Sequence, residues 1–284
     1  MGQNAATEFA PSGTGRCRNC GATLEGAFCS SCGQRSVPIN PTVSELAGDA
    51  WHELSGYDGR IAASFRNLMR PGQLTVDYLQ GRRARYLPPV RLYLIASVVY
   101  FLAAAAAPVG AGGLRIGVWD DRGNMQLSAA DRAALDAELS ESPWIVRVLV
   151  DAVAKDPQAF RARVFTIMPR VFFGMLPVYA GIVWLFYRQQ RFPAALVFAV
   201  HLHAFAFLAF AISEAAKFTR LDALAIAVGA IMLVIVSIYA LRAQHAVFGG
   251  SWPATVAKAT AIGLLYILTA IPAFVIVFIW ASMV

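Results

Sequence analysis

Residues 223–241 read ALAIAVGAIMLVIVSIYAL, a run of nineteen residues that contains no charged side chain. As a helix this run rises about 28 Å at roughly 1.5 Å per residue, close to the roughly 30 Å of a bilayer's hydrocarbon core. Four similar runs lie at about Val90 to Ala107, Phe165 to Tyr187, Ala194 to Ser213 and Ala259 to Trp280. The predicted fold class is therefore an all-α integral membrane protein with about five transmembrane helices.

Composition and charge favour the same class. The 284-residue chain is 58% hydrophobic and 14% charged, whereas roughly 25% of residues are charged in ordinary soluble domains. In a membrane protein, a net charge of +7 reflects loop topology and attraction to anionic lipid more often than nucleic-acid binding. Membrane lipids are thus expected partners, and nucleic acid is not. Residues 1–15 lack a basic start and an apolar stretch, so we expect a disordered tail rather than a secretory signal.

All four cysteines lie in one short stretch, which reads CRNCG at residues 17–21 and CSSCG at residues 29–33. The CxxC spacing lets two thiolates reach one ion, and two such pairs complete the tetrahedral shell of a structural Zn²⁺ site. Four thiolates fill the coordination shell of the ion and leave no open position for catalysis. A unit this small has no hydrophobic core, so metal binding must supply the free energy that folds it. We therefore predict a zinc ribbon at residues 16–36. Its metal ligands are Cys17, Cys20, Cys29 and Cys32.

Two further points concern this ribbon. Gly21 and Gly33 follow the second cysteine of each pair, where a positive φ turns backbone N–H groups toward the sulfurs. Two disulfides are the alternative to zinc, and they would require an oxidising compartment.

Residues 42–89 are predicted to form amphipathic helices at the membrane surface. The first begins at a capping box, residues 42–45. Between positions 60 and 91, seven arginines accompany a single acid, Asp77, near the apolar side chains of Tyr78, Tyr86 and Leu87. This pattern indicates a segment in the headgroup layer of anionic lipid, although the arginines alternatively mark topology alone. The predicted lipid-interface residues are Arg60, Arg66, Arg70, Arg82, Arg83 and Arg85.

Several short segments carry a family resemblance. They are NCG at 19–21, FCSSCGQ at 28–34, RPG at 70–72, DY at 77–78, GRRARY at 81–86 and PP at 88–89. Over roughly residues 17–100 the chain thereby resembles the bacterial zinc-ribbon membrane proteins grouped as domain of unknown function family 3667. The resemblance implies a ribbon joined to a polytopic membrane region. Because the family has no established activity, the resemblance implies no active-site residues.

Positive charge marks one side of the predicted bundle. Arg188 and Arg191 follow the second run, and Arg242 and Lys258 follow the fourth, whereas the loop after the third run has balanced charges. The positive-inside rule then places the N-terminus in the cytoplasm and the C-terminus outside, and the family resemblance implies a bacterial inner membrane. Residues 108–164 are expected to form an external cap, with a hairpin around residues 120–124 and a capped helix from Ser128.

Few polar residues lie within the predicted spans. His201 and His203 project to different sides of one helix, so they do not chelate one ion together. We expect each to hydrogen-bond to a neighbouring helix, with a metal or proton-relay role as the alternative. Pro177 and Pro272 are interpreted as packing kinks, with cavity lining of the transporter kind as the alternative.

The sequence contains no recognisable nucleophile with a base, phosphate loop or open metal site, so we predict no catalytic or cofactor-binding residues. The favoured function is a zinc-ribbon adaptor or scaffold that docks a cytoplasmic protein at the membrane. A transporter or channel component using the intramembrane histidines is the second hypothesis. A lipid-acting membrane enzyme, with Arg82, Arg83 and Arg85 as headgroup contacts, is the third.

Overall fold

The computed structural model describes residues 15–34 apart from 25 and 27, residues 60–108 and residues 157–283. It also describes short pieces at 118–119, 125–126, 137, 139–140, 142–144, 146–147 and 150. Several predictions therefore lie wholly or partly outside the described residues. Of the tail predicted at residues 1–15 only residue 15 is described, the capping box at residues 42–45 is not described, and the helix predicted from Ser128 is described only at residues 137 and 139–140, which are helical.

Five helices are long and apolar enough to cross a membrane. They are α4 (Pro89–Ala106), α7 (Pro157–Phe186), α8 (Phe192–Ala216), α9 (Asp222–Phe248) and α10 (Trp252–Met283). The predicted all-α multi-pass membrane protein with five spans is therefore confirmed. Helices α7 and α10 continue through Pro177 and Pro272, so these prolines do not divide the spans.

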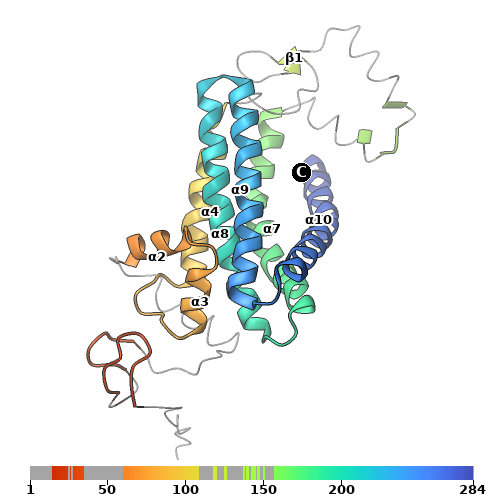
Figure 1. Cartoon of the computed structure of the whole chain (residues 1–284). Coiled ribbons are helices and arrows are strands. Elements are labelled where there is room, and N and C mark those ends of the chain that lie inside the picture. Colours follow the sequence, from red (N-terminus) through yellow and green to blue (C-terminus); the bar gives the residue numbers. More distant parts are fainter. Residues whose placement is uncertain are drawn as a thin grey trace, which may run out of the picture.

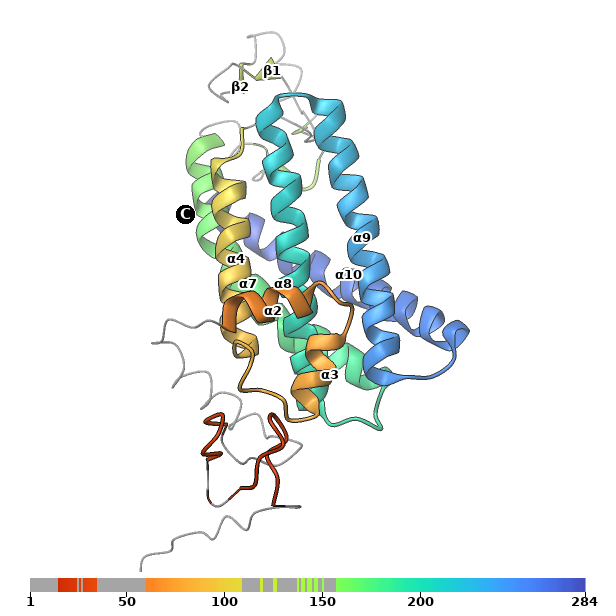
Figure 2. The same ribbon diagram turned by 60° about the vertical axis from the view of Figure 1, so that its left-hand side comes forward.

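The bundle is organised around α8. In its apolar window 67% of the residues are buried within the protein, against 11% for α9 and 11% for α10. Helix α8 contacts α4, α7 and α9, while α10 contacts α7 and α9. The ribbon, α3 (Gln73–Leu79) and the α9–α10 turn lie at one end of the bundle, here called the ribbon side, and the α8–α9 turn with its short 3₁₀ helix η1 (Lys217–Thr219) lies at the other (Figures 1 and 2).

The elbow, residues 60–88, immediately precedes α4 in the chain. It consists of α2 (Arg60–Leu68), α3 and the loop that follows α3 (Figure 2). The turn between the two helices depends on Gly72, whose φ of 76° is accessible to glycine without strain. A Cβ on Gly72 would also lie 3.0 Å from the carbonyl oxygen of Ala243 on α9. The glycine therefore permits both the turn and its close packing on α9.

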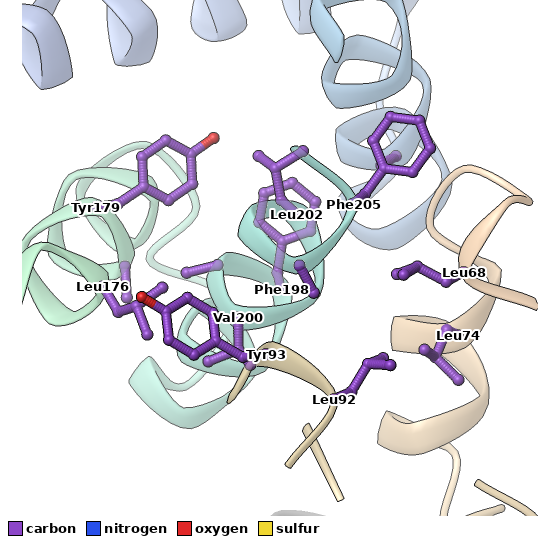
Figure 3. Packing of buried hydrophobic residues seen from close by; sticks show 14 of the residues in the cluster. Leu68, Leu74, Leu92, Tyr93, Leu176, Tyr179, Phe198, Val200, Leu202 and Phe205 are labelled. Atoms are coloured by element: carbon purple, nitrogen blue, oxygen red, sulfur yellow. The ribbon is translucent and has the colours of Figure 1, made fainter. Parts of the chain in front are cut away.

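The elbow belongs to the same hydrophobic core as the bundle. Leu68, Leu74 and Leu87 of the elbow join one cluster with residues of α4, α7 and α8, and Figure 3 shows members of this cluster. Helix α3 contacts both α8 and α9. Burying these leucines stabilises the docked elbow by roughly 1.5 to 3 kcal/mol for each side chain relative to exposure.

This packing corrects one sequence interpretation. Tyr78, Tyr86 and Leu87 were expected in the lipid headgroup layer, yet they are only 5%, 3% and 1% exposed, inside the protein. An amphipathic pattern indicates that one face is covered, but it does not distinguish lipid from a neighbouring helix. In this protein α8 and α9 provide that cover for α3.

Two short strands lie between the first two spans. Strand β1 (Val118–Trp119) pairs antiparallel with β2 (Met125–Gln126), with Val118 opposite Gln126. They flank the position predicted for a hairpin turn, residues 120–124, whose own residues lie outside the described part of the chain.

Candidate metal centre and its link to the membrane bundle

The four cysteine sulfurs converge on one point. All four Sγ atoms lie within 4.8 Å of one another, with 3.6 Å between Cys17 and Cys32 and 3.6 Å between Cys20 and Cys29. A tetrahedral Zn²⁺ with Zn–S bonds of about 2.3 Å separates its sulfurs by roughly 3.8 Å. All four cysteines are free, so the predicted disulfide alternative is not what the structure contains. The donor set and its spacing thus fit one tetrahedral metal ion.

The two knuckles share one backbone pattern. The Gly21 N–H donates to the Cys17 carbonyl at 2.7 Å, and the Gly33 N–H donates to the Cys29 carbonyl at 2.8 Å. Both glycines have positive φ, 81° and 70°, as the sequence predicts. This left-handed conformation tightens each turn and brings the two thiols of a pair to the same side. The second knuckle ends at Gln34, whose carbonyl accepts from the Cys29 N–H at 2.8 Å.

The side chain of Gln34 attaches the ribbon to the elbow. Its Nε2 donates to the Gly81 carbonyl at 2.6 Å, and its Oε1 accepts from the backbone N–H groups of Arg83 at 3.1 Å and Ala84 at 3.0 Å. A second, exposed contact joins the Arg85 guanidinium to the carbonyl oxygen of Asn19 at 3.1 Å. The ribbon is therefore held on the elbow by hydrogen bonds from both of its knuckles.

Asp77 organises the elbow from within. Its carboxylate accepts from Tyr86 Oη at 2.5 Å, from Arg82 Nη2 at 2.5 Å and from Gln73 Nε2 at 2.8 Å. Burial raises the pKa of Asp77, but the hydrogen bonds from Tyr86, Arg82 and Gln73 outweigh it and leave the pKa below its ordinary value. Asp77 therefore stays ionised and ties α3 to the loop that follows it.

Tyr86 extends this network to α2. Burial, together with the hydrogen bond to Asp77, raises the pKa of Tyr86 above its ordinary value. Its hydroxyl also accepts from Asn67 Nδ2 at 3.1 Å. Next to it, the Leu87 N–H donates to Ser64 Oγ at 2.7 Å. These contacts hold the loop after α3 against α2.

Two buried polar contacts dock the elbow onto the bundle. Thr75 Oγ1 on α3 lies 2.9 Å from His201 Nδ1 on α8. Tyr239 Oη on α9 donates to the Leu68 carbonyl at 2.8 Å, which satisfies a carbonyl at the end of α2. Hydrogen bonds buried in an apolar core are hard to break, because each partner left unpaired there costs free energy.

The second intramembrane histidine also has protein partners. His203 Nδ1 lies 2.8 Å from the Ala199 carbonyl, and its Nε2 lies 2.9 Å from Tyr266 Oη on α10. A single neutral tautomer, with the proton on Nδ1, satisfies both contacts. The expectation that each histidine bonds to a neighbouring helix is confirmed, with Thr75 as the partner of His201. The two histidines do not form a metal site with other described residues.

The predicted lipid-interface arginines have separate environments. Arg82 pairs with Asp77, Arg83 stacks on Tyr78 with 4.6 Å from its Cζ to the ring centroid, and Arg85 contacts the ribbon. Arg66 and Arg70 are exposed, and Arg60 is half-buried. The structure therefore uses the GRRARY loop to connect parts of the protein, while lipid contact by any of the six arginines stays a prediction.

Sequence reasoning assigned no role to the polar residues of this link, among them Gln34, Asp77 and Thr75. A signal existed for Asp77, because a lone acid among seven arginines is well placed to pair with one of them. A glutamine after a knuckle and a threonine within a short helix carry no comparable signal. Their roles depend on which backbone groups the tertiary fold brings near them.

Comparison with protein families matched one segment of the chain. The model of a family described as "Protein of unknown function (DUF3667)" matches residues 58–101, which contain α2, α3, the loop after α3 and most of α4. The resemblance is thus confirmed for this segment, and the ribbon lies outside it. Neither the curated proteins nor the solved structures gave a match.

Proposed function

We propose that the protein is a membrane-embedded adaptor whose ribbon binds one Zn²⁺ and docks a cytoplasmic protein at a bacterial inner membrane. The ion would be held by the four cysteine thiolates, and its chemistry there is structural, because it fixes the ribbon's fold. One observation carries the proposal. The ribbon is hydrogen-bonded through Gln34 to an elbow that is itself packed into the membrane bundle.

This arrangement suits docking because it gives the ribbon a fixed orientation. A partner that binds a pre-oriented surface loses less conformational entropy than one that must order a tethered domain. The ribbon also presents Phe28, which is 63% exposed beside the buried Cys29. Exposed aromatic side chains are common anchors in protein interfaces, so Phe28 is the residue we assign to first contact with the partner.

Site-specific photocrosslinking in native membranes tests the proposal. A crosslinking amino acid at Phe28 is expected to give one dominant protein adduct. The same group at Leu264, an exposed residue of α10, is the control for random membrane collisions. The Phe28 adduct is expected to disappear in Cys29→Ser, which removes a metal ligand, and to weaken in Gln34→Ala, which leaves all four ligands in place.

Two results would contradict the adaptor. One is a Phe28 adduct pattern identical to that from Leu264. The other is a dominant adduct that persists unchanged in Cys29→Ser, since the partner would then not depend on a folded ribbon. The transporter hypothesis ranks second, because His203 uses both ring nitrogens in contacts to Ala199 and Tyr266 and the Nδ1 of His201 is engaged by Thr75.

A further inference from the structure

An apolar pocket opens between the elbow and three spans on the ribbon side. It has a volume of about 300 Å³ and eleven lining residues, of which only Tyr78 carries a polar side-chain atom. Tyr78 comes from α3, Pro89 from the start of α4, Gly174 and Pro177 from α7, and Val197 from α8. The pocket therefore lies where the elbow meets the membrane bundle.

The size and lining of this pocket suit a hydrocarbon chain. An engineered cavity of roughly 150 Å³ holds benzene, and ligand sites begin at roughly 300 Å³. Gly174 leaves its part of the wall open, because a Cβ built on it meets no atom within 4 Å. Water has almost no hydrogen-bond partner in such a space, so an apolar occupant is favoured.

Two guanidinium nitrogens without acceptors in the described part of the chain belong to Arg83, whose side chain stacks on the pocket-lining Tyr78. Arg83 stacks over the ring of Tyr78, and its Nε donates to the Tyr78 carbonyl at 3.3 Å. Its Nη1 and Nη2 are buried but have no hydrogen-bond partner among the described residues. Arg18 Nη1 is likewise unpartnered, and the Arg18 side chain packs against Gly81, two residues before Arg83.

Buried guanidinium nitrogens without acceptors are rare, because each lost hydrogen bond to a charged group is costly. The two free nitrogens of Arg83 form a planar fork that matches the oxygens of a phosphate. Arg82 does not compete for this anion, since its charge is neutralised by Asp77. The loop thus retains a positive charge over Tyr78, a residue that lines the apolar pocket.

The depth of the pocket identifies the source of the ligand. Pro89 is the first residue of α4, and Val197 follows the first residue of α8 by five positions, about 7 Å along the helix axis. Both positions belong to the half of the bundle nearest the ribbon, so the pocket faces the membrane leaflet on that side. A phospholipid of this leaflet places its phosphate at the membrane surface and its chains in the interior.

From these observations we propose that the pocket binds one acyl chain of an anionic phospholipid from the ribbon-side leaflet, whose phosphate accepts hydrogen bonds from Arg83. The apolar lining binds the acyl chain, and Arg83 gives the site its preference for an anionic headgroup. This proposal does not rest on the ribbon's role as an adaptor, because the phosphate is assigned to the Arg83 side chain whereas Gln34 is bonded to the Arg83 backbone N–H.

Native mass spectrometry of the full-length protein in detergent tests the site. Delipidated protein is titrated with dioleoyl phosphatidylglycerol, dioleoyl phosphatidylcholine or inorganic phosphate. The first lipid is expected to bind as one copy, roughly tenfold more tightly than the second. Arg83→Gln is expected to remove this preference, and Gly174→Leu, which projects into the pocket, to weaken both lipids by roughly tenfold.

Two matched variants serve as controls. Arg188→Gln removes an arginine that also lies over an aromatic ring, Trp184, on the ribbon side. Gly181→Leu changes a glycine of α7 whose Cβ position is equally open but does not line the pocket. Both are expected to bind lipid as the unchanged protein does.

Three outcomes would overturn the proposal. They are equal binding of the two lipids by the unchanged protein, unaltered binding by Gly174→Leu, and displacement of the lipid by inorganic phosphate at millimolar concentration. The first and third outcomes need no variant, so the test stands even where a substitution perturbs folding. The third would assign the guanidinium to free phosphate instead of a lipid headgroup.

Discussion

Replacing Gln34 with alanine removes the side chain that joins the ribbon to the elbow while leaving all four cysteines intact. Gln34 makes three hydrogen bonds to backbone groups of residues 81, 83 and 84. Each contributes about 1 kcal/mol net, and because Gln34 is only half-buried, water recovers part of this in the variant. We expect a loss of about 2 kcal/mol of local stability, which is roughly thirtyfold in the opening equilibrium.

Hydrogen exchange measures this effect directly. In the unchanged protein, the Arg83 and Ala84 amides donate to Gln34, so within a peptide spanning residues 81–87 these two amides should exchange roughly thirtyfold faster in Gln34→Ala. Gln80→Ala is the control, because Gln80 is exposed in the same loop and its side chain has no hydrogen bond to a described residue. Unchanged exchange in Gln34→Ala would refute the reasoning, since the ribbon would then be held by other contacts.

Three further predictions follow from the same structure. Elemental analysis after reducing, metal-replete purification should give one zinc per chain and less in Cys20→Ser, whereas metal-free protein or two disulfides in cells would contradict the metal site. Alkaline phosphatase fused at the C-terminal end should be active, and a cytoplasmic reporter fused there inactive, if the ribbon is cytoplasmic. Asp77→Asn should reduce the unfolding free energy by about 1 to 3 kcal/mol, because a buried carboxylate with three donors is lost. The pKa of Asp77 is lower in the folded protein than its unfolded value of about 3.9. The difference in unfolding free energy between the two proteins should therefore be complete above about pH 4 and vanish as pH falls through the folded pKa. Unfolding measured as a function of pH tests this.

The membrane spans were predictable because their physical cause is local. Some twenty consecutive apolar residues, such as residues 223–241, have no stable place outside lipid, whatever the remaining chain does. The ribbon was predictable for a similar reason, because the CxxC spacing and the following Gly21 and Gly33 define each knuckle within five residues. The convergence of the two knuckles then needs only the short segment between them.

The elbow was harder to predict because its environment is set by distant residues. The pattern around Tyr78 and Tyr86 shows that one face is apolar, and only the fold reveals that α8 and α9 cover it. The contact between Thr75 and His201 joins residues 126 positions apart. No spacing rule connects such a pair, so the docking of the elbow and the role of Gln34 emerge only in three dimensions.

Two sets of contacts act in series: one set joins the ribbon to the elbow, and the other joins the elbow to the bundle. The weaker set therefore determines how firmly the ribbon is held. The contacts from Thr75 to His201 and from Tyr239 to Leu68 are buried, where water does not replace a broken hydrogen bond. The contact from Arg85 to Asn19 is exposed and contributes little. Gln34, which is half-buried with three hydrogen bonds, therefore carries most of the ribbon–elbow set, and this set is the weaker of the two. The ribbon should therefore detach at Gln34 while the elbow stays docked, which is why exchange at residues 81–87 is expected to change before exchange in α3.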